Sequence, residues 1–176
     1  MCMASNIIFD VKGDLIMNDY IIFTDSTCDL DAEHIKELGV KTIPLNFTYE
    51  GKSYIDGAGL SYKDFYNLLR EKKDITTSQI NACTFIKEFE PYLKEQKDIL
   101  YIAFSSGLSG TYSSAKIAEA DLQEKYPDRK IIVIDSLCAS MGEGLLVHYA
   151  AEKKDNGASI EELAKWIENN KLSVCH

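Results

Sequence analysis

The sequence predicts an α/β fold, an open and mostly parallel sheet with helices on both faces. Strand-like apolar runs alternate along the chain with segments of helical periodicity, which is the order in which parallel sheets are built. Short polar clusters follow several of the apolar runs, as loops at the carboxyl edge of such a sheet do. The chain has 176 residues, 45% of them hydrophobic and 27% charged, which is enough to bury one core of ordinary size.

The first half of the chain contains several strand candidates and two helices. Residues 20–23 are apolar and rich in β-branched and aromatic side chains, which favours a strand. A second run alternates at Ile43, Leu45 and Phe47, the period of a half-buried strand. In chain order, we expect a strand at 20–23, a short helix around 35–38 that Gly39 ends, a strand at 41–49 that Gly51 turns into a hairpin with 52–55, and a helix that Ser61 caps before Phe65.

The second half continues the alternation. Phe85, Phe89 and Leu93 recur every four residues after Asn81, as on the buried face of a helix. Pro91 lies inside this pattern and is expected to kink or split the helix. The later elements are expected to be a strand at 99–104, a helix to about residue 125, a strand at 130–134, a helix with Gly142, Leu145, Leu146, Tyr149 and Ala150 on one face, and a helix capped by Ser159 and Glu162 that buries Leu163, Trp166 and Ile167.

Two hydroxyl-rich runs are the strongest functional signal. Residues 76–79 read Thr-Thr-Ser-Gln, and residues 105–111 read Ser-Ser-Gly-Leu-Ser-Gly-Thr. We expect both at strand-to-helix turns, where free backbone N–H groups and the positive end of the helix dipole attract an anion. Together they predict a site for a small anion, although for any single run the commoner role of Ser and Thr is to cap a helix or form a turn.

Polar clusters also follow the other predicted strands. Asp25-Ser26-Thr27 comes after 20–23, and Asp135-Ser136 comes after 130–134. Since open α/β sheets bind ligands at the carboxyl edge, near the point where the strand order reverses, we expect these clusters and Ser105-Ser106 to meet around one crevice. The candidate ligand-binding residues are Ser26, Thr27, Thr77, Ser78, Ser106, Gly107, Ser109 and Gly110.

Composition argues against several classes of protein. The formal net charge is −9 and the 19 Lys and Arg residues form no long block, which disfavours a nucleic-acid partner. The five cysteines are odd in number and contain no C-x-x-C pair, which disfavours a disulfide framework or a zinc site and indicates a reducing cytoplasm. Cys28 and Cys138 lack an evident base and are predicted to be small buried filler. No segment approaches the roughly 18 apolar residues of an integral membrane helix.

The sequence offers no evident catalytic residues. His34 and His148 fall in predicted helices and His176 is the last residue, so no serine has an obvious base. Residues 107–111 have Thr where the hydrolase elbow G-x-S-x-G needs its second glycine. Neither a P-loop nor a glycine-rich dinucleotide turn occurs. We therefore expect a protein that is not an enzyme and needs no cofactor or metal.

Four motifs in one order carry a resemblance to a known family. They are Thr24-Asp25-Ser26-Thr27-Cys28-Asp29-Leu30, Thr76-Thr77-Ser78-Gln79, Ser105-Ser106-Gly107-Leu108-Ser109-Gly110-Thr111-Tyr112-Ser113-Ser114-Ala115, and Asp135-Ser136 with Met141-Gly142-Glu143-Gly144. In this succession the chain, from Tyr20 to its end, resembles the DegV family of bacterial fatty-acid-binding proteins. It departs from the family pattern at Ile80, where the family usually has Pro, and this departure is expected to loosen the turn while leaving the hydroxyls in place.

The resemblance implies a two-lobed α/β protein that encloses a long-chain fatty acid, with the carboxylate near the lobe junction. By motif position, the carboxylate-binding hydroxyls fall on Thr77 and Ser109. The resemblance also implies a lipid carrier that presents its fatty acid to a separate fatty acid kinase catalytic subunit, which makes acyl phosphate. The alternative that the residues leave open is a small enzyme or sensor that binds a phosphorylated or carboxylated metabolite in the same crevice.

Both ends of the chain carry expectations of their own. Residues 1–16 are interpreted as a non-native or disordered leader, because Lys12-Gly13-Asp14 can be encoded by a sequence like a ribosome-binding site shortly before the Met17 codon. Residues 17–176 are interpreted as one DegV-like lobe. Residues 172–176 read as the start of another strand, so most of the second lobe that the resemblance implies is expected to be missing.

Overall fold

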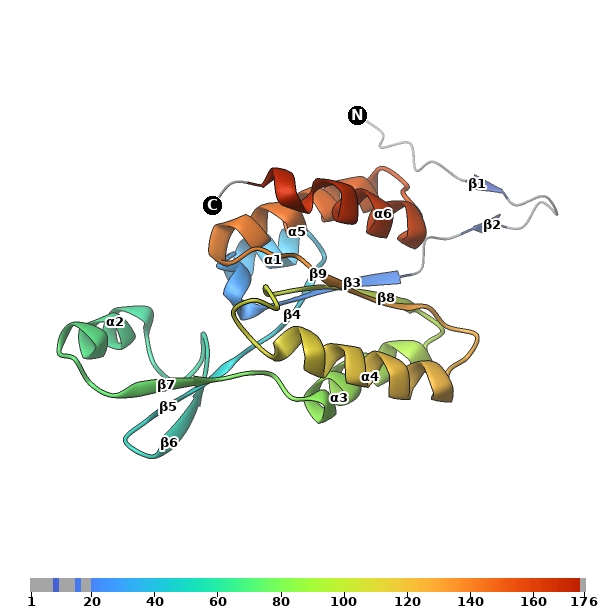
Figure 1. Cartoon of the computed structure of the whole chain (residues 1–176). Coiled ribbons are helices and arrows are strands. Elements are labelled where there is room, and N and C mark those ends of the chain that lie inside the picture. The colour runs from blue at the N-terminus through green and yellow to red at the C-terminus, as the bar shows by residue number, and fades with distance from the viewer. Residues whose placement is uncertain (1–7, 10–14, 17–19, 175–176) are drawn as a thin grey trace.

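In a computed structural model, the protein is built around a four-stranded parallel sheet (Figure 1). The structure describes residues 8–9, 15–16 and 20–174. The strands of this sheet, in the order β4-β3-β8-β9, are β4 (Lys41–Ile43), β3 (Tyr20–Asp25), β8 (Asp98–Ala103) and β9 (Ile131–Asp135). All three pairings are parallel. The predicted α/β class with an open parallel sheet is confirmed.

The strand order reverses at the centre of this sheet. From β3 the chain crosses to β4 on one side, and it later returns to β8 on the other side of β3, with β9 beyond it. The β3–β8 pairing is in register from Tyr20 opposite Asp98 to Phe23 opposite Tyr101. The carboxyl ends of β3 and β8 therefore border the switch point at which open α/β sheets bind ligands.

Helices cover both faces of the sheet (Figure 1). The helices on one face are α3 (Ala82–Lys94) and α4 (Thr111–Lys125), and those on the other are α1 (Ala32–Glu37), α5 (Ser140–Asp155) and α6 (Ile160–Asn170). Because successive strand residues point to opposite faces, the strands supply two cores. Tyr101 lies in the core beneath α3 and α4, while Leu100 and Ile102 lie in the core beneath α5 and α6.

A second sheet of three antiparallel strands lies between β4 and α3 in the chain. In the order β6-β5-β7, its strands are β6 (Lys52–Ile55), β5 (Asn46–Tyr49) and β7 (Ile75–Ser78). The predicted hairpin is confirmed, since Glu50 and Gly51 adopt φ values of 48° and 71° between β5 and β6, as a tight two-residue turn requires. The single strand predicted at 41–49 is wrong. Pro44 has no N–H to offer a ladder, and the chain passes from one sheet to the other at this point.

The helix α2 (Tyr62–Arg70) packs against this second sheet through aromatic side chains. The ring centroid of Phe65 lies 4.9 Å from that of Phe47, which in turn stacks on Tyr54 at 5.3 Å. Ser61 caps the helix as predicted, because its hydroxyl accepts the N–H of Asp64 at 3.1 Å. The second sheet and α2 thus form a small unit of their own beside the parallel sheet (Figure 1).

Pro91 was predicted to kink or split the helix after Asn81, and of these the split is wrong, while a kink stays a prediction. α3 continues through Pro91 as one helix, and Asn81 caps it by accepting the N–H of Thr84. Pro91 is exposed, whereas Phe89 and Leu93 are buried in the core on either side of it. Burial of these two side chains therefore holds the helix together across the missing N–H of the proline.

The buried face of α5 is narrower than the sequence predicts. Gly142, Leu146 and Ala150 are buried as expected, but Leu145 and Tyr149 remain 39% and 43% exposed. The exposed pair belongs to the face of α5 that turns away from the sheet. Tyr149 on this face still contacts the ring of Trp166 of α6 edge to face, with centroids 6.3 Å apart.

The C-terminal end of the described chain agrees with expectation only in part. Ser159 and Glu162 form the predicted capping box of α6, which buries Leu163 and Ile167 but leaves Trp166 only partly covered. A short 3-10 helix, η2 (Lys171–Ser173), stands where a new strand was predicted, and residues 175–176 lie outside the described residues.

The N-terminal leader predicted at residues 1–16 lies mostly outside the described residues. Within it, β1 (Ile8–Phe9) and β2 (Leu15–Ile16) pair as two short antiparallel strands. The non-native origin of this stretch stays a prediction. Across the described ranges, none of the helices combines the length and the apolar character needed to cross a bilayer.

Candidate functional site

The three polar clusters predicted at the ends of strands lie together at one edge of the parallel sheet. They follow β3, β8 and β9, which are neighbours in the sheet. The N–H of Phe104 donates to Asp25 Oδ2 at 3.1 Å, and the N–H of Ser106 donates to Asp135 Oδ1 at 3.1 Å. Each carboxylate thus reaches the loop after β8 from a neighbouring strand. The predicted convergence of the clusters is confirmed.

The hydroxyls of Ser26 and Thr27 are engaged by protein groups. They lie in η1 (Ser26–Cys28), the 3-10 turn after β3. Ser26 Oγ accepts the N–H of Leu45 at 3.1 Å, which ties the end of β3 to the chain entering the second sheet. Thr27 Oγ1 lies 2.5 Å from Asp25 Oδ1 and 2.8 Å from Glu143 Oε2. Their ligand-binding role stays a prediction, and in this structure both hydroxyls stabilise the fold.

The hydroxyl-rich run at residues 105–111 forms a turn between β8 and the N-terminus of α4, as predicted. Ser109 Oγ accepts the N–H of Thr111 at 3.2 Å and lies 2.9 Å from Thr111 Oγ1. The N–H of Gly107 donates to Ser105 Oγ at 3.3 Å, which closes the turn on itself. The first bond of the helix runs from Ser114 N–H to Gly110 C=O. The backbone N–H groups in the first turn of α4 therefore have no acceptor within the helix.

The hydroxyl-rich run at residues 76–79 does not form the predicted turn. Residues 75–78 form strand β7, in which Thr77 lies opposite Phe47 and Ser78 opposite Asn46 of β5. Thr77 and Ser78 are both exposed. The sequence misled the prediction because hydroxyl residues favour turns in isolation, whereas the pairing with β5 decides the local structure here.

The end of β7 nevertheless reaches the N-terminus of α4. Gln79 Nε2 donates to Ser114 Oγ at 3.2 Å, and the N–H of Ile80 donates to Thr111 Oγ1 at 3.3 Å. Gly110 leaves room for this contact, since a Cβ there would lie 2.0 Å from Gln79 Oε1. The two runs are thus joined through Gln79 and Ile80. In the part of the chain that the structure describes, no hydrogen bond links Thr77 directly to Ser109.

Ile80 tightens this connection. We predicted that an isoleucine in place of the family's proline loosens the turn, but Ile80 is buried and its N–H forms the bond to Thr111. A proline has no N–H and could not make this bond. The structure thus shows no loosening at Ile80, and the hydroxyls of Thr77 and Ser78 lie on strand β7 and not in the predicted turn.

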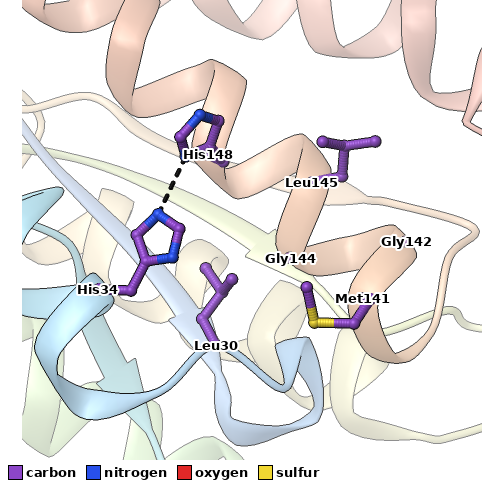
Figure 2. Close-up of a pocket in the computed structure, with 7 residues that line it drawn as sticks. All are labelled: Leu30, His34, Met141, Gly142, Gly144, Leu145 and His148. Atoms are coloured by element: carbon purple, nitrogen blue, oxygen red, sulfur yellow. Dashed lines mark hydrogen bonds between the residues drawn. The ribbon is translucent and has the colours of Figure 1, made fainter.

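An apolar pocket of about 500 Å³ opens between α1 and α5 (Figure 2). Its lining residues are Leu30, His34, Met141, Gly142, Gly144, Leu145 and His148. Figure 2 shows the two imidazoles pointing toward one another, with Nε2 of His34 3.1 Å from Nδ1 of His148. We predicted no pocket at this place, although Gly142 and Leu145 were expected together on one face of a helix. The exposed apolar side chains of Met141, Leu145 and Tyr149, four residues apart, were the signal that could have indicated this surface.

The buried cysteines show no sign of reactivity. Cys28 and Cys138 are both about 1% exposed, as predicted for filler. Burial raises the pKa of the Cys28 thiol to about 12, and burial also raises the pKa of Cys138. A thiol that stays protonated is a poor nucleophile and a poor metal ligand. Among the described residues, no group of three or more His, Cys, Asp or Glu side chains is arranged to hold a metal ion.

Comparison with known sequences gives a consistent match. The sequence model described as "Uncharacterised protein, DegV family" matches residues 20–176. A DegV domain-containing protein of Clostridium perfringens (strain 13 / Type A) is 46% identical over 162 residues, which cover 91% of this chain and 56% of that protein. The chain therefore spans about half the length of the curated relatives it matches.

Solved structures share the fold over about half of their own chains. A DegV family protein from Thermus thermophilus, described by its fatty acid binding, is 30% identical with a TM-score of 0.77, over 88% of this chain and 54% of that one. A stearic-acid-binding protein from Eubacterium ventriosum is 26% identical with a TM-score of 0.79, over 85% and 52%. DegV of Bacillus subtilis, described as a fatty acid binding protein, is 28% identical with a TM-score of 0.77, over 88% and 54%.

Proposed function

Because the chain belongs to the DegV family, we propose that it takes part in binding a long-chain fatty acid through its carboxylate and in presenting that carboxylate to a separate fatty acid kinase. The relatives described as fatty-acid-binding proteins support the ligand class. The kinase step rests on the family resemblance. It also agrees with a site whose polar residues lie at the surface, since Thr77 and Ser106 are exposed.

The observation that carries the proposal is the N-terminus of α4. Its first-turn amides, including those of Tyr112 and Ser113, precede the Ser114–Gly110 bond and are free to point at an anion. The hydroxyl of Ser109 lies beside them, 2.9 Å from Thr111 Oγ1, and either of these two hydroxyls can be the donor in this contact. A carboxylate at this position would accept bonds from these groups and lie at the positive end of the helix dipole.

Two segments border the proposed carboxylate site, and we call them its walls. Ser109 belongs to the turn before α4, and Thr77 extends from the exposed strand β7, two residues before the contact with α4. We assign the carboxylate to the space that these two hydroxyls border. The apolar pocket beside α5 supplies surface for part of the acyl chain.

The acyl chain dominates the affinity in this arrangement. Burial of one CH₂ contributes about 0.8 kcal/mol, so a long chain contributes on the order of 10 kcal/mol in total. A hydrogen bond to a charged carboxylate contributes roughly 1.5–3 kcal/mol. The head-group contacts therefore set which end of the ligand is presented, more than how tightly the ligand is held.

Native mass spectrometry of the purified protein tests the ligand class. We expect a bound species with the mass of a fatty acid, either retained from expression or after incubation with oleic acid. Protein that stays unliganded in both cases would contradict fatty acid binding. A bound water-soluble phosphorylated or carboxylated metabolite would support the alternative, a small enzyme or sensor that uses the same crevice.

The substitutions Thr77→Ala and Ser109→Ala test the head-group assignment. We expect each to reduce ligand retention modestly and to slow acyl phosphate formation by a fatty acid kinase more strongly. Thr76→Ala is the matched control, because Thr76 lies next to Thr77 on β7 but points to the other face of the sheet. Transfer at the unmodified rate by both Thr77→Ala and Ser109→Ala would show that the assignment is wrong.

A further inference from the structure

Two buried carboxyl groups lie on either side of one hydroxyl beneath the candidate site. Asp25 ends β3, and Glu143 lies in the first turn of α5. Both side chains are fully buried. Thr27 Oγ1 lies between them, 2.5 Å from Asp25 Oδ1 and 2.8 Å from Glu143 Oε2. Neither carboxyl group has a role in the proposed ligand chemistry.

A count of hydrogen atoms shows that Asp25, Thr27 and Glu143 together hold one proton more than they would if both carboxyl groups were ionised. The hydroxyl of Thr27 has one hydrogen and can donate it to only one of the two carboxyl groups. If both carboxyls were ionised, the other contact would bring two oxygen atoms to hydrogen-bond distance without a hydrogen between them. One of the two carboxyl groups must therefore be protonated.

The surroundings of the two groups differ, and this difference assigns the proton. Asp25 accepts the N–H of Thr27 at 3.1 Å and the N–H of Phe104 at 3.1 Å, and the hydroxyl of Tyr101 lies 2.7 Å from its Oδ2. Two backbone donors, one on each oxygen, are the environment of an ionised carboxylate. Among the described residues, the carboxyl group of Glu143 has only hydroxyls as hydrogen-bond partners, those of Thr24 at 2.9 Å and Thr27.

We propose that Glu143 is protonated at neutral pH and donates its hydrogen to Thr27, which in turn donates to the ionised Asp25. This chain of hydrogen bonds makes Glu143 a positioning residue for the turn at residues 105–111. Asp25 holds the N–H of Phe104, one residue before that turn, and Glu143 holds Thr27 and Asp25 in place from α5. The effect on the ligand rests on the proposed function, whereas the position of the proton does not.

The charges around Glu143 support this assignment. Burial raises the pKa of Glu143 well above its usual range, and the negative charge of Asp25 raises it further, while its hydrogen-bond contacts with the hydroxyls of Thr27 and Thr24 act in the opposite direction. The other titratable groups that face it are Asp29, after η1, Tyr101 of β8, and the thiols of Cys28 and Cys138. Each of these groups is either negative or neutral, so none favours an ionised Glu143.

The proposal predicts the sign of a pH effect. A group whose pKa is higher in the folded than in the unfolded protein stabilises the fold below its unfolded pKa, and this stabilisation is lost as the pH rises toward the folded pKa. Glu143→Gln removes this dependence. Its amide NH₂ can donate to Thr27 and its oxygen can accept from Thr24, as the protonated acid does.

Urea unfolding of the full 176-residue chain without ligand, from about pH 6 to about pH 9, tests the position of the proton. We expect the midpoint of the unmodified protein to fall with rising pH, and that of Glu143→Gln to fall less and to lie above it at the upper end. Glu124→Gln, an exposed change of the same charge on α4, should follow the unmodified protein. A Glu143→Gln profile that lies below the unmodified one and parallel to it would overturn the proposal.

Two further measurements separate Glu143 from Asp25. Infrared spectra of protein with isotope-labelled glutamate should show the carbonyl band of a protonated carboxyl group at neutral pH, and Glu143→Gln should lack it. The same band in aspartate-labelled protein instead would overturn the assignment. Asp25→Asn should lower the urea midpoint at every pH, because its NH₂ group would face a backbone donor. If Asp25→Asn instead flattens the pH profile and keeps the midpoint, the proton belongs to Asp25.

Fatty acid retention by Glu143→Gln and Glu143→Ala then tests the positioning role. We expect Glu143→Gln to retain the ligand as the unmodified protein does at neutral pH, and Glu143→Ala to lose most of it. Equal retention by both variants would contradict the positioning role and leave the proposed function intact. Failure of the unmodified protein to bind any fatty acid would contradict the proposed function, and the urea and infrared results would still decide where the proton lies.

Discussion

Nε2 of His34 lies 3.1 Å from Nδ1 of His148, so that one hydrogen bond joins α1 to α5 at the side of the apolar pocket. The two rings meet edge to face, with centroids 5.2 Å apart. His148 Nε2 also lies 3.7 Å from Glu152 on the following turn of α5. The short helix α1 buries none of its own six residues completely, and this bond adds to the packing of its partly buried Ile35 against the core that α5 covers.

A double-mutant cycle with His34→Phe and His148→Phe measures this bond. We expect each single change to destabilise the fold, and a coupling free energy of about 0.5–1.5 kcal/mol between the two positions, the usual net contribution of such a bond. Urea unfolding of the four proteins gives the value. Strictly additive effects would show that the two rings do not stabilise one another.

Gly144→Ala should destabilise the protein more than any other glycine-to-alanine change near the site. A Cβ at Gly144 would lie 2.5 Å from the backbone oxygen of Cys28, so α5 or η1 must shift. Such overpacking costs about 1–3 kcal/mol, which thermal unfolding can detect. Gly107→Ala is the matched control, because a Cβ there meets only Ser105 Oγ, at an ordinary 3.5 Å. Equal melting temperatures for the two variants would contradict the prediction.

Glu90 should contribute to stability above about pH 4 and lose this contribution in acid. Hydrogen bonds from Lys125, Lys94 and Tyr126 lower the pKa of Glu90 to about 2, and those from Lys125 and Tyr126 join α3 to the end of α4. Since the folded pKa lies below the unfolded one, the stabilisation is present above the unfolded value and disappears as the pH falls towards 2.

Urea unfolding at a series of acidic pH values checks the role of Glu90. We expect Glu90→Gln to weaken the decline of stability in acid, and the neighbouring exposed Glu88→Gln to leave it unchanged. The expectation fails if both variants decline in acid as the unmodified protein does.

Ser159→Ala should destabilise α6 by about 1 kcal/mol, the typical loss on removal of a serine cap. The hydroxyl of Ser159 accepts the N–H of Glu162 at 3.2 Å, and the carboxylate of Glu162 accepts the N–H of Ser159 at 2.9 Å. Ser159→Asp should keep most of the stability, because Asp is an equally good cap. Thermal unfolding compares the three proteins, and a loss of equal size in both variants would show that the cap is not the cause.

Local patterns predicted the strands of the parallel sheet and most of the helices, because the position of each element along the chain depends on neighbours in the sequence. The caps at Ser61, Asn81 and Ser159 lie three residues from the amides they accept. The run of apolar residues in β8 marks a strand that is buried from Ile99 to Ala103. Signals of this kind need no knowledge of distant partners.

The parts that the sequence did not predict depend on long-range contacts. Thr76 and Thr77 look like turn residues until β5 pairs with them. The hydroxyl of Thr27 looks free until Glu143, 116 residues later, packs against it. In each case a polar side chain has a role that only its partner defines, and no local pattern identifies that partner.

The small antiparallel unit at residues 46–78 is attached to the parallel sheet at both of its ends in the same way. Ser26 receives the N–H of Leu45 just before the unit, and Thr111 receives the N–H of Ile80 just after it. These two hydroxyls therefore hold the unit that carries Thr77 against the turn after β3 and the N-terminus of α4. For the proposed carboxylate site, variation at Thr111 would also remove a hydrogen-bond partner of Ser109, whereas variation at Ser26 would shift the segment that carries Thr77 and leave both proposed hydroxyls unchanged. We therefore expect the size of the head group that this site accepts to depend on Ser26, which lies outside the proposed pair of Thr77 and Ser109.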